Sequence, residues 1–227
     1  MKPSEKLLGK NGRAAPESNG LPIELIGNRF FYLWKDAVFS EGSSLFVPMG
    51  YGVAFIREGR FLKQAGAGTL RPFHYLKNLL NLSGSDAVYV DVAVARTVEY
   101  HDNWVNGNRV RYRDPITGIA YHLGMSGDYS LRVEYLKFFF EYCLGKNWSF
   151  TDMKMILGDQ SNDFLETIRT AAQEHIIRRN YGKDDIDSSL GEIGSEVKRR
   201  LNIAVFNRIG IEVVRFSINK HVHAIAD

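Results

Sequence analysis

The amino-acid sequence predicts an α+β fold, with antiparallel β-meanders first, amphipathic helices next and a closing β-strand. Three stretches support this order. Residues 88–95 alternate valine with other residues, as a strand with one buried face does. Residues 160–209 place apolar residues at the spacing of a helix face, and residues 211–218 alternate again and are rich in β-branched side chains. Strands that precede helices favour antiparallel sheets over a parallel α/β fold.

The composition limits the classes of protein to consider. The chain has 227 residues, of which 44% are hydrophobic, so it can bury a substantial core. A net charge of +3 is too small to indicate a polyanion-binding protein. The basic residues 198–200 lack the interleaved aromatic side chains of a base-stacking surface, so we expect no nucleic-acid partner. The single cysteine, Cys143, excludes an internal disulfide and fits a reducing compartment.

Residues 1–25 are predicted to be a flexible leader. They are rich in Lys, Gly, Ser, Pro and Asn and lack the apolar segment of a signal peptide. No run elsewhere approaches the roughly 20 apolar residues that cross a bilayer. We therefore expect a cytoplasmic protein, either soluble or held peripherally at a membrane surface.

Residues 26–84 are predicted to form an N-terminal β-rich subdomain. Its strand candidates are residues 30–34, 44–49, 51–57 and 61–64. Glu58, Gly59 and Arg60 favour a tight hairpin turn between the last two of these strands. Residues 73–82 can form a helical turn or two, and the Ser-Gly-Ser sequence at residues 83–85 marks the boundary.

Residues 85–220 are predicted to form an α+β subdomain. It comprises strands within residues 86–133, helices within residues 133–209 and a strand at residues 211–218, followed by a tail at residues 221–227. The valine side of residues 88–94 should face the core. Residues 104–108 favour a turn, and Gly127 favours a bend or bulge within a later strand.

Helix-ending residues divide the helical part. Gly145 ends a short helix at residues 133–144 that is crowded with aromatic side chains, and a second short helix ends near Gly158. A longer helix follows Gln160 and ends at Asn180, a residue that tolerates left-handed backbone. Asp187 or Ser188 is the expected N-cap of the next helix, which stops at residue 210, a glycine.

Two surfaces are candidates for contacts with other molecules. Arg109, Arg111 and Arg113 share one face of a strand and could contact phosphates or lipid headgroups, although an exposed hairpin face is the alternative. In the aromatic helix, Phe138 and Phe140 point away from the stripe that would fill a core. They are therefore either buried in the domain or covered by another subunit or a membrane surface.

The groups able to do chemistry do not form a recognisable catalytic pattern. Cys143 lies in an apolar helix, where a small buried hydrophobe is the default. His221 and His223 could bind a metal from one strand, but the sequence offers no evident third ligand. Asp187 belongs to an acidic cluster interpreted as linker and N-cap residues. We therefore assign no catalytic residue, cofactor, metal or small-molecule substrate.

Several motifs resemble those of one family. Residues 45–62, LFVPMGYGVAFIREGRFL, resemble the opening hairpin of the stomatin/prohibitin/flotillin domain, also called SPFH or band 7, and residues 64–70 are similar to the glycine-containing loop that follows it. Residues 88–98, 113–115 and 127–133 are closest to a soluble bacterial branch described as virion-core-protein-like. Residues 210–218 are similar to the glycine and strand that end that domain. The resemblance covers residues 26–220.

The resemblance implies a non-enzymatic scaffold. Such a domain self-associates, often at a membrane, and organises partner proteins or lipid, in some cases in membrane stress responses. We therefore expect a homo-oligomer that contacts a membrane surface or membrane-associated proteins. The alternative is a structural or assembly protein of a particle or filament. The chain departs from the family in having neither an N-terminal hydrophobic anchor nor a long C-terminal coiled coil.

Overall fold

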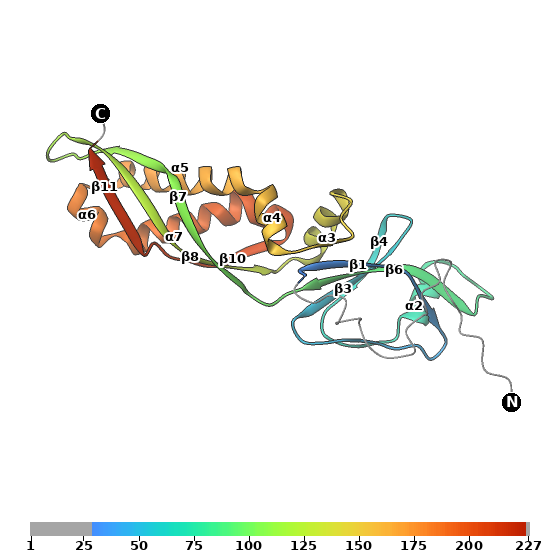
Figure 1. Cartoon of the computed structure of the whole chain (residues 1–227). Coiled ribbons are helices and arrows are strands. Elements are labelled where there is room, and N and C mark those ends of the chain that lie inside the picture. The colour runs from blue at the N-terminus through green and yellow to red at the C-terminus, as the bar shows by residue number, and fades with distance from the viewer. Residues whose placement is uncertain (1–28, 226–227) are drawn as a thin grey trace. The chain divides into compact units, whose positions relative to one another are not determined.

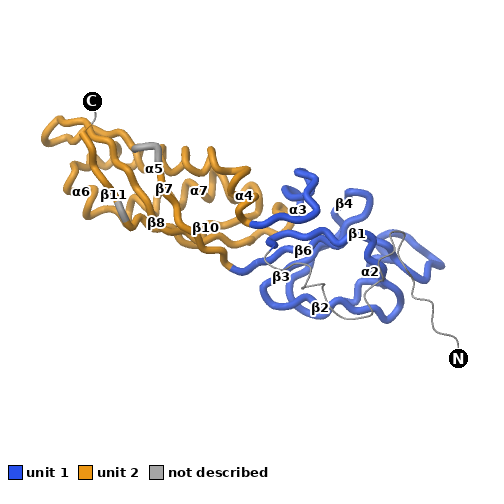
Figure 2. Tube along the Cα trace, in the orientation of Figure 1, with its two compact units in different colours: residues 1–98, 140–152 blue, residues 99–139, 153–227 orange. Residues whose placement is uncertain are grey.

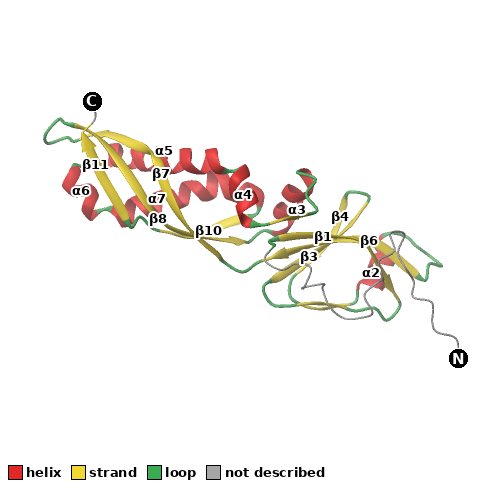
Figure 3. Cartoon of the chain, viewed as in Figure 1, coloured by secondary structure: helices red, strands yellow, loops and turns green. Residues whose placement is uncertain are grey.

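The structure is a computed structural model that describes residues 29–225, without the side chains of residues 107–109 and 220. The chain divides into two compact units (Figure 2). The first contains residues up to 98 and Phe140–Asp152, and the second contains Glu99–Phe139 and the residues from 153 onward. Helices accompany antiparallel sheets (Figure 3), which confirms the predicted α+β class.

The first unit is built on a five-stranded antiparallel sheet with the order β4-β3-β6-β1-β9. Its strands are β1 (Phe31–Ser40), β3 (Tyr51–Arg57), β4 (Arg60–Ala65), β6 (Ala87–Arg96) and β9 (Phe150–Thr151). A small second sheet joins β2 (Leu45–Val47) to β5 (Gly68–Leu70), and helix α2 (Pro72–Leu79) follows it. The valine side of β6 is buried in the core of this unit, as predicted.

The predicted hairpin turn of the first unit is confirmed. Glu58 and Gly59 both have positive φ, at 52° and 74°, between β3 and β4. Two consecutive residues with positive φ match the right-handed twist of the strands that they join.

The second unit contains a sheet centred on β8 (Figure 1). Its strands are β7 (Tyr100–Arg113), β8 (Ala120–Val133), β10 (Ile211–Phe216) and β11 (Lys220–Ile225). One edge of β8 pairs with β7, whereas β10 and β11 share the other edge one after the other. All of these pairings are antiparallel.

Helices cover one face of this sheet, where α5 and α7 lie side by side (Figure 1). These helices are α4 (Met153–Asp159), α5 (Ser161–Arg179), α6 (Lys183–Ser188) and α7 (Leu190–Leu201), and α3 (Leu136–Gly145) precedes them in the chain. A π-helical turn (Asn202–Phe206) and a 3-10 turn (Asn207–Ile209) extend α7. The predicted helix ends at Asn180 and Gly210 are confirmed, since both residues have left-handed backbone, with φ of 55° and 76°.

Side chains protect the outer edge of β10. The amide group of Asn202 accepts a hydrogen bond from the Val213 N–H at 2.7 Å and donates one to the Val213 carbonyl at 3.3 Å. Lys198 Nζ donates to the Val214 carbonyl at 2.7 Å. The backbone groups of an edge strand are a template for pairing with other chains, so these bonds close that edge.

Three predicted boundaries differ from the structure. Residues 104–108 are not a turn, because β7 continues through them by pairing with β8 and absorbs extra residues between Asn106 and Val110. Residues 221–225 are not a tail, because β11 pairs with β8 as far as Ile225. The boundary between the two units does not lie at residue 84, because β6 pairs with β1 and β3 of the first unit.

Two further predictions about single residues are wrong, and one lies outside the described residues. Asp187 and Ser188 lie inside the short helix α6, and Ser189 precedes α7. β8 has no bulge at Gly127, since the pairing with β7 is regular on both sides of it. The predicted leader falls on residues 1–25, which the structure does not describe.

Gly127 lies where the chain passes from β10 to β11. A Cβ atom on this residue would collide with the carbonyl group of Ser217, which lies directly against it. That carbonyl accepts a hydrogen bond from Trp104 Nε1 at 3.1 Å, and the Trp104 ring stacks on Phe216 with 4.9 Å between centroids. The absence of a side chain at residue 127 therefore makes room for the crossing segment.

We expect Gly127→Ala to destabilise the second unit strongly. The new methyl group must displace backbone, so the free energy of unfolding should fall by about 1–3 kcal/mol or more. Gly124→Ala is a matched control in the same strand, because a Cβ there meets nothing within 4 Å, and its effect should stay within about 0.5 kcal/mol. Urea unfolding of both variants measures the difference, and equal midpoints would contradict the close approach.

Candidate functional site

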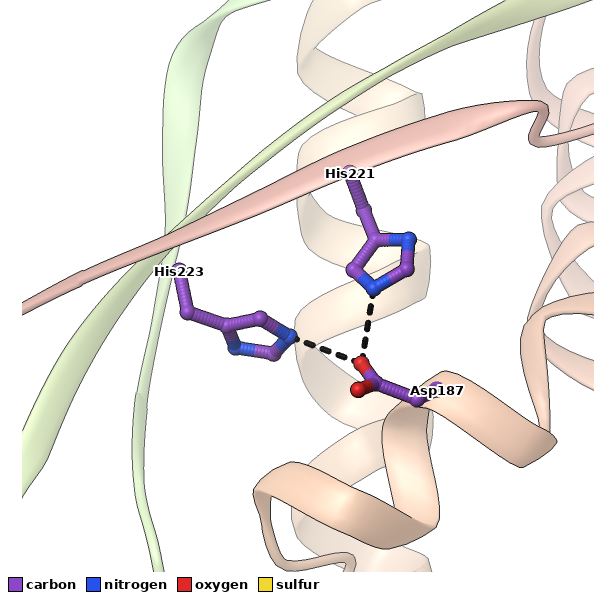
Figure 4. Close-up of side chains that lie close together, drawn as sticks. All are labelled: Asp187, His221 and His223. Carbon is purple, nitrogen blue, oxygen red and sulfur yellow. Dashed lines mark hydrogen bonds and ion pairs between the residues drawn. The ribbon is translucent and has the colours of Figure 1, made fainter.

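Three side chains able to bind a metal converge in the second unit. His221 and His223 lie on β11, and Asp187 lies on α6 (Figure 4). Side chains of a strand alternate between its faces, so residues 221 and 223 share one face. The register places His221 opposite Met125 and His223 opposite Leu123, both of which are buried. The two imidazoles therefore face the helical layer, in which Asp187 lies.

Both imidazoles approach the same carboxylate oxygen. The Nε2 atom of His221 lies 2.7 Å from Asp187 Oδ1, and the Nε2 atom of His223 lies 3.0 Å from it. The two rings are nearly perpendicular, at 86°, with 5.3 Å between centroids. The three potential ligand atoms all lie within 4.8 Å of one another. A single ion could therefore reach all three.

The His223 side chain is held in place by aromatic neighbours. It is only 7% exposed, and its Nδ1 atom lies 2.8 Å from the Tyr112 hydroxyl oxygen. Tyr112 stacks on Tyr121 with 5.6 Å between ring centroids. Burial, with smaller contributions from Asp114, Tyr121 and Asp187, raises the pKa of the Tyr112 hydroxyl. This hydroxyl therefore stays protonated and can either donate to or accept from the imidazole.

Asp187 forms the open side of the cluster, with its side chain 48% exposed. Partial burial acts to raise the pKa of its carboxyl, but hydrogen bonds from His223 and His221 outweigh it and hold the pKa below the ordinary value. The residue is therefore a carboxylate at neutral pH. One carboxylate and two imidazoles are a common ligand set for divalent transition metals.

Asp114 fixes the position of the helix that carries Asp187. Its Oδ1 atom accepts hydrogen bonds from the N–H groups of Ile116, at 2.9 Å, and Thr117, at 2.8 Å. Its Oδ2 atom accepts the N–H of Lys183, the first residue of α6, at 2.8 Å. Hydrogen bonds from Thr117 and Lys183, assisted by Ile116, lower the pKa of the Asp114 carboxyl despite its burial. The β7–β8 turn and α6 are thereby tied to one ionised side chain.

The predicted arginine surface lies beside this turn. Arg111 and Arg113 are exposed on β7, on the face opposite the buried Val110 and Tyr112, and the side chain of Arg109 lies outside the described residues. Arg113 Nη1 donates a hydrogen bond to the Gly118 carbonyl at 2.7 Å. At the tip of the turn, Ile116 is 85% exposed, and Ile119 is partly exposed as well. An apolar tip therefore follows two exposed arginines in the chain, and the end of the Ile116 side chain lies toward Gly182.

The aromatic helix α3 differs from the prediction at one of its two candidate contact residues. Phe138 is 49% exposed and packs against the half-exposed Tyr135, with 6.3 Å between ring centroids. Phe140 is fully buried and packs against Phe31 at 6.3 Å between centroids, so of the two alternatives stated for it, burial in the domain is confirmed and it is not a contact surface. The reason is that the buried stripe includes residues 139, 140 and 143 together, a wider arc than the sequence pattern indicated.

Cys143 belongs to this buried stripe and is fully inaccessible. Burial raises the pKa of its thiol. The thiolate is the nucleophilic form of cysteine, so this residue is not poised for nucleophilic chemistry.

A separate hollow of about 470 Å³ lies on the second unit. It is lined by His101, Asp102, Asn103, Asp128, Tyr129, Ser130, Arg215, Phe216 and Ser217. Acidic and basic side chains are mixed in this lining, so no charge sign dominates. None of these residues is a candidate site residue from the sequence alone.

The sequence indicated the histidine pair but not its acidic partner. Asp187 precedes the histidines by 34 and 36 residues and was interpreted as an N-cap. The useful signal was the alternation of His221 and His223, which places both imidazoles on one strand face. The opposing carboxylate depends on how α6 packs, which no local pattern shows.

Comparison of the chain with models of known protein families and with curated proteins finds no match. The resemblance to the SPFH domain therefore stays a prediction based on motifs. Within residues 29–225, no helix is long and apolar enough to cross a membrane.

We expect the Cys143 thiol of the folded protein to be unreactive. Because it is buried and its pKa is raised, Ellman's reagent should modify it at neutral pH only after denaturation. The absorbance change of the reaction, followed with and without guanidinium chloride, measures this. Rapid stoichiometric reaction of the native protein would contradict this expectation and make Cys143 a candidate nucleophile.

Proposed function

We propose that the protein is a non-enzymatic scaffold that associates with itself and with anionic membrane surfaces. The observation that carries this proposal is the β7–β8 turn, which exposes Ile116 and directly follows the exposed Arg111 and Arg113 of β7. Apolar side chains can enter the boundary between lipid headgroups and acyl chains, while arginines are attracted to anionic lipids. The SPFH-like motifs of the sequence point to the same class of function.

The rigidity of the turn supports this role. Asp114 accepts three backbone hydrogen bonds and so holds the turn in one conformation before any contact is made. A preorganised loop loses less conformational entropy when it binds.

One such contact binds a membrane only weakly, so stable membrane binding requires several copies of the protein to associate. Burying one isoleucine in the membrane contributes about 2 kcal/mol to the free energy of binding. Two arginines near an anionic surface add about 1 kcal/mol each. The sum of about 4 kcal/mol corresponds to a dissociation constant of about 1 mM. Several copies held together bind more tightly than one copy through avidity, commonly by about 10²–10⁴-fold in affinity.

The pair formed by Tyr135 and Phe138 is the surface that we propose for contact between copies. Both rings are half-exposed on the second unit and pack on each other. Aromatic side chains are enriched in the centres of protein interfaces because they bury a large area at a small cost in side-chain entropy.

We expect the protein to co-sediment with vesicles that contain phosphatidylserine and not with pure phosphatidylcholine. Both Ile116→Ser and the double variant Arg111→Glu, Arg113→Glu should weaken binding at least about tenfold, because each removes about 2 kcal/mol or more. Ile177→Ser is the matched control, since it removes an exposed isoleucine beside Arg178 on α5. Equal binding to both lipids, or equal loss in the control, would overturn the membrane part of the proposal.

We expect wild-type protein to form oligomers whose mass falls on dilution, and Phe138→Ser to shift the equilibrium toward monomer. Phe46→Ser is the control, because Phe46 is exposed to the same extent but lies on β2 of the first unit. Sedimentation velocity over a hundredfold range of concentration measures the shift. A wild-type protein that stays monomeric throughout would rule out self-association, and closed shells or filaments in electron micrographs would favour a particle-forming protein instead.

A further inference from the structure

We propose that Asp187, His221 and His223 form a binding site for one divalent transition-metal ion of the Zn²⁺ type. The site is independent of the scaffold function, because it uses neither Ile116, Arg111 and Arg113 nor the Tyr135 and Phe138 pair. It rests on the convergence of three ligand atoms from two elements that are far apart in the sequence.

The chemistry of the ligands selects the class of ion. Mg²⁺ and Ca²⁺ prefer coordination by oxygen alone, whereas imidazole nitrogen suits Zn²⁺ and its neighbours in the first transition series. Two imidazoles and one carboxylate supply three ligands of a tetrahedron. The half-exposed Asp187 leaves a side open for water as the fourth ligand.

Tetrahedral binding requires Asp187 and His221 to adjust their positions. Zn–N and Zn–O bonds of about 2.0–2.2 Å at tetrahedral angles place two ligand atoms about 3.3 Å apart. The two Nε2 atoms lie 2.7 and 3.0 Å from Asp187 Oδ1. A movement of a few tenths of an ångström by the exposed carboxylate lengthens these two distances to the tetrahedral spacing. A movement of His221 sets the distance between the two imidazole nitrogens, which lie within 4.8 Å of each other, while His223 stays fixed by its burial.

The Tyr112 hydroxyl allows His223 to present a free electron pair to the ion. Without metal, His223 Nε2–H donates to Asp187 and the Tyr112 O–H donates to Nδ1, within the observed 3.0 and 2.8 Å. With metal, Nε2 binds the ion, the imidazole proton resides on Nδ1, and the N–H there donates to the Tyr112 oxygen. The neutral imidazole keeps one proton in both states. Outer partners of this kind orient metal-binding histidines in many sites, so Tyr112 is a positioning residue.

Metal binding at this site would connect α6 to β11. These elements are joined in the metal-free state by hydrogen bonds to a single, half-exposed carboxylate. Coordination bonds to three side chains would hold the strand more firmly against the helical layer. The ion should therefore raise the melting temperature, because it binds the folded chain better than the unfolded one.

The experiment is titration of the tag-free full chain, first treated with chelator, with Zn²⁺ by isothermal calorimetry. We expect one ion per chain, no binding of Mg²⁺ under the same conditions, and a visible Co²⁺ spectrum typical of tetrahedral coordination. Asp187→Asn and His221→Ala should remove binding at concentrations that saturate the wild type. Tyr112→Phe should weaken binding by about 10–100-fold while keeping the stoichiometry and the form of the Co²⁺ spectrum.

His101→Ala is the control, since His101 is an exposed histidine on β7 outside the site, and this variant should bind as the wild type does. Circular dichroism in chelator verifies that each variant folds, and Asp187→Asn is nearly isosteric with the wild type. Absence of stoichiometric Zn²⁺ binding to the wild type, or unchanged binding in both Asp187→Asn and His221→Ala, would overturn the proposal. The cluster would then be a hydrogen-bonded contact only.

Discussion

The close approach of the Ser217 carbonyl to Gly127 is the constraint on which the second unit depends. Two strands share one edge of β8, so the chain must cross that edge between them. The crossing is possible because residue 127 has no side chain, and Trp104 secures it through a hydrogen bond to the same carbonyl and stacking on Phe216. Without this crossing, β11 could not pair with β8.

The two proposed activities of the second unit follow from this placement and from Asp114. Once β11 is in register, alternation turns His221 and His223 toward the helices rather than toward solvent. Asp114 then determines where the opposing carboxylate stands, because it accepts the N–H of the first residue of α6. The same side chain shapes the turn that exposes Ile116. One buried carboxylate thus organises both the candidate metal centre and the candidate membrane contact.

The sequence predicted those elements whose cause is local. The turn at Glu58 and Gly59, the helix ends at Asn180 and Gly210, and the buried valines of β6 all follow from backbone preference or alternation. The failures have tertiary causes. Residues 104–108 contain turn-forming residues, yet pairing with β8 keeps β7 extended.

The candidate site likewise combines a feature visible in the local sequence with one that depends on tertiary packing. The pattern of His221 and His223 was visible as two histidines on one strand face, although the strand itself was taken for a tail. Asp187 could not be assigned to them, because its position depends on α6 being held by Asp114, 69 residues from Lys183 in the sequence. The alternatives for Phe138 and Phe140 stayed open for a related reason, since a helix rich in aromatics does not reveal how wide its buried arc is.

Helix α3 belongs to both units, since residues up to 139 group with the second and residues from 140 with the first. The strand β9, which pairs with one edge of β1, is therefore translated only after β7, β8 and α3. At roughly 5–20 residues per second, a ribosome takes several seconds to supply it. During that interval Phe31 and Tyr32, the residues of β1 that pair with β9, lack this partner strand, which makes neighbouring chains on one polysome potential partners for incorrect strand pairing.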